Sequence, residues 1–77
     1  MQAYNRSRII DMLDETELRI FCKALDAYQV SDYETASDLM NELEQRFVGV
    51  HGFDMHAAYT MRNLVWKTIC DLGKGIR

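Results

Sequence analysis

Four side chains of this 77-residue sequence have the chemistry of transition-metal ligands: Cys22, His51, His56 and Cys70. Structural zinc sites usually take their ligands in close pairs, such as two cysteines separated by two residues. No such pair occurs here, and His51 falls in a predicted loop while His56 falls in the first turn of a predicted helix. A buried cysteine more often acts as a small apolar side chain. We therefore expect no metal and no other cofactor.

The same cysteines are poor candidates for a catalytic nucleophile, which needs a neighbouring histidine and an orienting carboxylate. Both fall on predicted apolar helix faces, where a thiol stays protonated and unreactive. Carboxylates are plentiful, but so short a chain leaves little room for the water-free cleft that would shift their pKa values. The G-K-G at 73–75 lacks the preceding strand and the spacing of a phosphate-binding loop. We expect no enzymatic activity.

Residues 30–37, V-S-D-Y-E-T-A-S, resemble the turn and the start of the recognition helix in a helix-turn-helix motif. The spacing differs by one residue, Thr35 stands where a buried aliphatic side chain is usual, and Gln29 replaces the turn glycine. The helix that follows also carries five carboxylates against one arginine, and DNA phosphates would repel them. We expect no DNA binding through this helix. A small helix-turn-helix-like transcription regulator remains the alternative.

Charge is distributed unevenly along the chain, whose net charge is −3. Residues 32–54 hold six acidic and one basic side chain (net −5), whereas residues 55–77 hold one acidic and four basic side chains (net +3). An acidic helix that faces outward suits a protein partner with a basic surface, and a merely solvated helix face is the other interpretation. We assign the acidic surface to Asp32, Glu34, Asp38 and Glu42.

The elements that position these side chains are predicted to be helices. Proline is absent, and the start signals are Asn5 or Ser7, Asp14 with Glu17, Ser31 with Glu34, and Asp54. They predict helices at about 5–13, 14–28, 32–47 and 55–72, with Gly73 as a terminator and 73–77 as a frayed tail. In the third helix the apolar residues recur at steps of three and four, as Tyr33, Ala36, Met40, Leu43 and Phe47. We predict one all-α domain over 1–77, a small bundle of three to four antiparallel helices.

A chain of this length buries a thin core, which self-association commonly supplements. We therefore predict a homodimer. We expect no secretory signal and no membrane-spanning segment, because no apolar run of the sequence approaches the roughly 20 residues that cross a bilayer. With two cysteines only, we expect a cytoplasmic protein with reduced thiols and no membrane contact.

The fourth helix has more apolar surface than one core face requires, so either the helix is central in the fold or one of its sides packs on a partner. Tyrosine, tryptophan and arginine are enriched at interface hot spots. We predict a partner-binding surface of Phe53, Met55, Tyr59, Arg62 and Trp66, although the aromatic residues could instead complete the core. The predicted function is a non-enzymatic protein-binding module that adapts, inhibits or regulates a larger protein. A structural subunit of an assembly is a further alternative.

Overall fold

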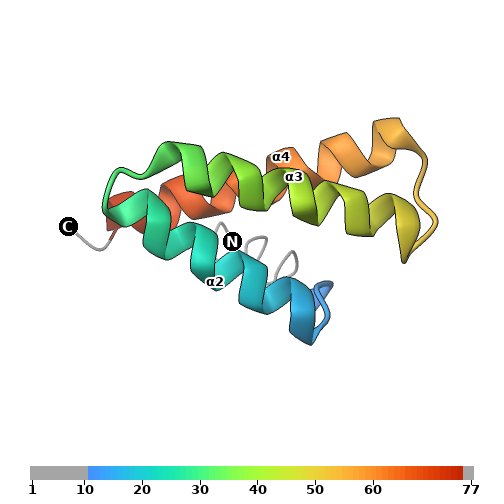
Figure 1. Ribbon diagram of the computed structural model, residues 1–77, viewed down its shortest axis with the longest axis horizontal. Coiled ribbons are helices and arrows are strands. Elements are labelled where there is room, and N and C mark those ends of the chain that lie inside the picture. Colours follow the sequence, from blue (N-terminus) through green and yellow to red (C-terminus); the bar gives the residue numbers. More distant parts are fainter. Residues whose placement is uncertain (1–10, 76–77) are drawn as a thin grey trace.

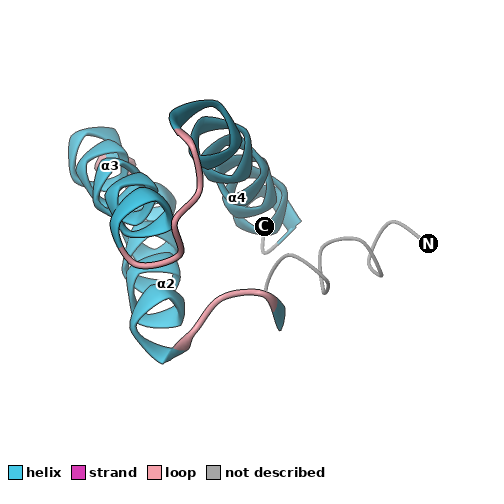
Figure 2. Ribbon diagram, turned by 90° about the vertical axis from the view of Figure 1, so that its right-hand side faces the viewer, coloured by secondary structure: helices cyan, strands magenta, loops and turns pink. Residues whose placement is uncertain are grey.

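The computed structural model of the chain describes residues 11–75, and three helices lie wholly within that range: α2 (Glu15–Gln29), α3 (Tyr33–Gly49) and α4 (Met55–Gly75). Consecutive helices run in opposite directions (Figure 1), and each contacts the other two (Figure 2). The predicted small all-α bundle is confirmed, while the predicted helix at 5–13 falls mostly outside the described residues. None of these three helices is both long enough and apolar enough to cross a membrane.

The start of α2 is a capping box, as the sequence predicted. Asp14 is the N-cap, and its Oδ1 accepts a hydrogen bond from the Glu17 backbone N–H at 2.8 Å. In return the Glu17 Oε1 accepts one from the Asp14 backbone N–H at 3.0 Å. Each carboxylate thus satisfies one of the backbone donors that a helix N-terminus leaves without a partner, and each keeps a second oxygen for other contacts.

The turn between α2 and α3 differs from the prediction, which made Ser31 the N-cap of the third helix. Asp32 is the N-cap instead, and its side chain accepts the Thr35 N–H. Ser31 ends α2: its N–H donates to the Tyr28 carbonyl at 3.0 Å, and the Asp32 N–H donates to the Ala27 carbonyl at 2.8 Å. These two bonds form a Schellman motif, which requires a left-handed residue. Ser31 therefore has φ 63°, a conformation that favours glycine.

The core lies where the inner faces of the three helices meet. The predicted apolar seam of α3 is confirmed at Ala36, Met40, Leu43 and Phe47, all of which are buried. Tyr33 is an exception, because it begins the helix at the end of the bundle and is 55% exposed. The other buried apolar residues come from all parts of the described chain: Leu13, Ile20, Phe21, Ala24, Ala27, Ala58, Val65 and Ile69.

Two further details of the helices differ from the prediction. The buried face of α2 is centred on Phe21 and Ala24, and this turns Cys22 into solvent. At the other end of the chain, α4 does not stop before Gly73 but continues to Gly75. Gly73 is buried, and a β-carbon there would lie 2.6 Å from ring atoms of Tyr28. Its role is close packing against α2 rather than helix termination.

Candidate functional site

A groove about 510 Å³ in volume lies between α3 and the start of α4. It is lined by residues from the C-terminal half of α3 and from the first turn of α4: Asn41, Glu44, Gln45, Val48, Gly49 and Met55. Asp54 places the start of α4 here, since its side chain accepts the Ala57 N–H at 2.7 Å and caps the helix as predicted. Met55 leaves 76% of its surface exposed. Val48 on α3 is also exposed, and so is Tyr59, which follows Met55 by one helical turn on α4. Exposed apolar side chains therefore cluster near the groove.

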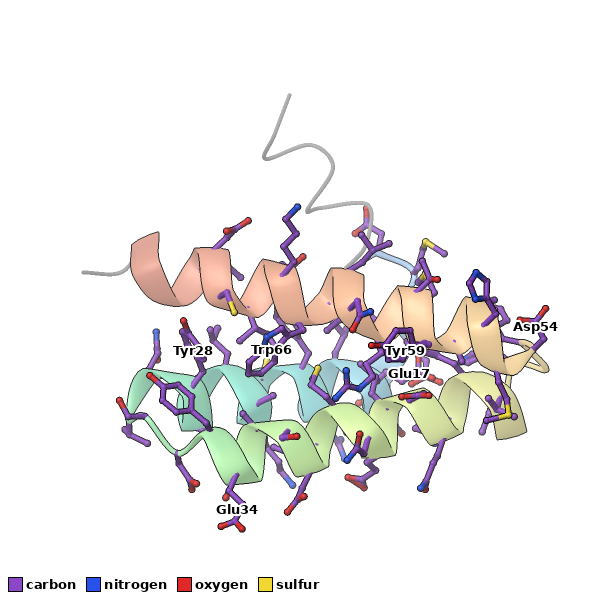
Figure 3. All side chains as sticks on the ribbon, turned by 90° about the horizontal axis from the view of Figure 1, so that it is seen from above. Glu17, Tyr28, Glu34, Asp54, Tyr59 and Trp66 are labelled. Carbon is purple, nitrogen blue, oxygen red and sulfur yellow. The ribbon has the colours of Figure 1, made fainter. Side chains whose placement is uncertain are left out.

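The predicted partner-binding residues are divided between this surface and the core. Met55 is exposed and lines the groove, and Tyr59 is exposed one helical turn further along α4. Phe53 is half-buried and stacks on Phe47, with ring centroids 5.8 Å apart. Trp66 is half-buried too, and its ring meets Tyr28 edge-on at 5.7 Å between α4 and α2 (Figure 3). The helical spacing of the aromatic residues therefore did not distinguish exposed positions from positions that complete the core.

Arg62, the remaining predicted interface residue, joins α4 to α3. Its Nε lies 3.4 Å from Glu44 Oε1, an ion pair without hydrogen-bond geometry, and the Arg62 side chain is only 19% exposed. Its terminal nitrogens donate to the side-chain oxygens of Asn41 and Asn63 at 3.4 and 3.2 Å. Two of these partners, Asn41 and Glu44, line the groove. Arg62 therefore holds the two walls of the groove together and neutralises the Glu44 carboxylate.

The predicted acidic surface lies on the outer side of α3. All four of its residues are exposed, although Asp32 is occupied as the helix cap. Glu34 points away from the bundle (Figure 3). Glu34, Asp38 and Glu42 form no ion pair with any described side chain. Their charges are therefore available to a partner, unlike that of Glu44.

The structure also assembles a polar cluster that the sequence did not predict. The Arg46 Nη2 donates to Asp14 Oδ2 at 2.9 Å, and its Nε donates to Glu17 Oε2 at 3.2 Å. The His51 Nε2 lies 2.6 Å from the same Glu17 oxygen and 3.8 Å from Asp14 Oδ2. Glu17 has no exposed surface and lies between α2 and α3. The cluster ties the start of α2 to the end of α3.

Electrostatics in this cluster favour the charged forms of Asp14 and Arg46. The backbone hydrogen bond from Glu17, with the bond and the charge of Arg46, holds the pKa of the Asp14 carboxyl below its ordinary value. The hydrogen bond to Asp14, followed by that to Glu17, raises the pKa of Arg46. A buried carboxylate is stable only when it is paired and hydrogen-bonded, and Glu17 meets both conditions.

Asp14, Glu17 and His51 also offer three possible metal-ligand atoms within 4.8 Å of one another. The Asp14 and Glu17 oxygens that lie 3.8 and 2.6 Å from His51 Nε2 are the same ones that the Arg46 guanidinium contacts, at 2.9 and 3.2 Å. A cation would therefore have to displace Arg46, which already supplies the compensating positive charge. The D-x-x-E pattern predicted the capping box, but no local sequence pattern predicted that Arg46 and His51 would contact it. We interpret the cluster as a structural clamp.

Comparisons with known proteins find no relative of this chain. No family model, no curated protein and no solved structure matches the chain. The function must therefore be inferred from the groove between α3 and α4, the acidic face of α3 and the polar cluster.

Proposed function

We propose that the protein is a non-enzymatic binding module that recognises a larger protein through the groove between α3 and α4, and so adapts, inhibits or regulates it. The observation that carries this proposal is the exposed apolar surface of Val48 and Met55, which line one groove, with Tyr59 exposed one turn beyond Met55. Apolar side chains scattered singly over a surface need no explanation, whereas a cluster beside a concave site commonly marks a binding surface.

The groove is suited to recognition because side-chain contacts join its walls. The Arg62–Glu44 ion pair joins the two helices at the groove, and the rings of Phe47 and Phe53 stack where the chain enters α4. A site whose walls are already ordered loses less conformational entropy on binding. Met55 and Tyr59 supply the large apolar contacts, and methionine adapts to irregular partner surfaces.

The DNA-binding alternative is less well supported. In a helix-turn-helix motif the two helices meet at about 90–120°. Here α2 and α3 run side by side in opposite directions (Figure 1) and contact each other. The outward carboxylates of Glu34, Asp38 and Glu42 would also face the phosphates. Both observations favour a protein partner.

The test is capture of partners from the native host by the tagged chain, followed by mass spectrometry. Met55→Ser removes the most exposed apolar side chain of the groove, and Met12→Ser is the matched control because Met12 is 58% exposed and does not line the groove. Loss of an interface contact worth about 1–2 kcal/mol weakens binding roughly five- to thirtyfold. We expect Met55→Ser, but not Met12→Ser, to lose the captured partner. Equal capture by both variants would refute the proposal.

A further inference from the structure

We draw no further inference here: the strongest candidate, the groove between α3 and α4, carries none because its one charged lining residue, Glu44, is already paired with Arg62, and nothing that the structure describes shows what covers the groove.

Discussion

Replacing Arg46 by methionine should reveal how much the polar clamp contributes to stability. Methionine keeps an apolar stem of similar length, so the change removes the guanidinium rather than the packing. The Glu17 carboxylate has no exposed surface and would lose one of its two side-chain partners, retaining only His51. Asp14 would lose its 2.9 Å contact as well, but its side chain is 40% exposed and water can replace the guanidinium there.

The magnitude follows from the burial of each group. Removing one partner of a fully buried ion pair costs about 3–5 kcal/mol. Arg46 itself is 27% exposed and His51 still contacts Glu17, so the loss should lie below that range. We expect the free energy of unfolding to fall by about 2–3 kcal/mol. For a domain of this size that corresponds to a drop in Tm of roughly 10–20 °C.

Urea denaturation followed by far-ultraviolet circular dichroism measures this change, and the chain offers a matched control. Arg19 pairs with Glu15 at 3.3 Å, but their side chains are 72% and 84% exposed. Arg19→Met should therefore cost only about 0.2–0.5 kcal/mol. If the two arginine variants lose the same small amount, the Arg46 contacts contribute little and the reasoning is wrong.

A double-mutant cycle identifies the residue through which Arg46 acts. Glu17→Gln keeps a side chain that can serve at the third position of a capping box but removes the buried charge. In that background Arg46→Met should lose at least about 1 kcal/mol less than in the natural sequence, because no buried carboxylate is left unpaired. Additive losses would assign the effect to Asp14 instead.

Three further expectations follow from the described geometry. Ser31→Gly should raise the free energy of unfolding by about 0.5–1 kcal/mol, because glycine accepts φ 63° without strain. As the control, Ser37→Gly in the interior of α3 should lower it by a similar amount, and urea midpoints that move in the same direction for both variants would contradict this. The pKa of Asp14 is lowered from its ordinary value of 3.8, so the ionised carboxylate stabilises the fold above that pH, and this stabilisation is lost as the pH falls through the folded-state pKa. Asp14→Asn keeps a capping side chain but has no such titration, so its stability in denaturant melts should fall less steeply below about pH 5. Sedimentation equilibrium at micromolar concentration should give twice the 9.0 kDa chain mass, because the exposed apolar residues can pack in the expected dimer. A monomeric mass together with a cooperative melt would contradict the dimer.

Local interactions explain what the sequence by itself determined. The positions of α2 and α4 follow from Asp14 with Glu17 and from Asp54, since an N-cap bonds to a backbone N–H only three residues away. The buried face of α3 follows from the steps of three and four between its apolar residues, because that period matches the turn of a helix. Even the left-handed conformation of Ser31, which was not predicted, has a local cause: Ser31 forms the end of α2, so Asp32 becomes the N-cap of α3.

Tertiary structure alone decided which side chains meet. Arg46 and His51 reach Glu17 across 29 and 34 positions of the chain, a separation that no capping or periodicity rule covers. The same holds on α4, where Tyr59 and Trp66 share one predicted helical face but end in different surroundings. Trp66 lies opposite Tyr28 of α2 and is partly covered, whereas Tyr59 lies beside the groove and stays exposed. A helix shows from its own sequence which residues share a face, but the neighbouring helices determine how much of that face is buried.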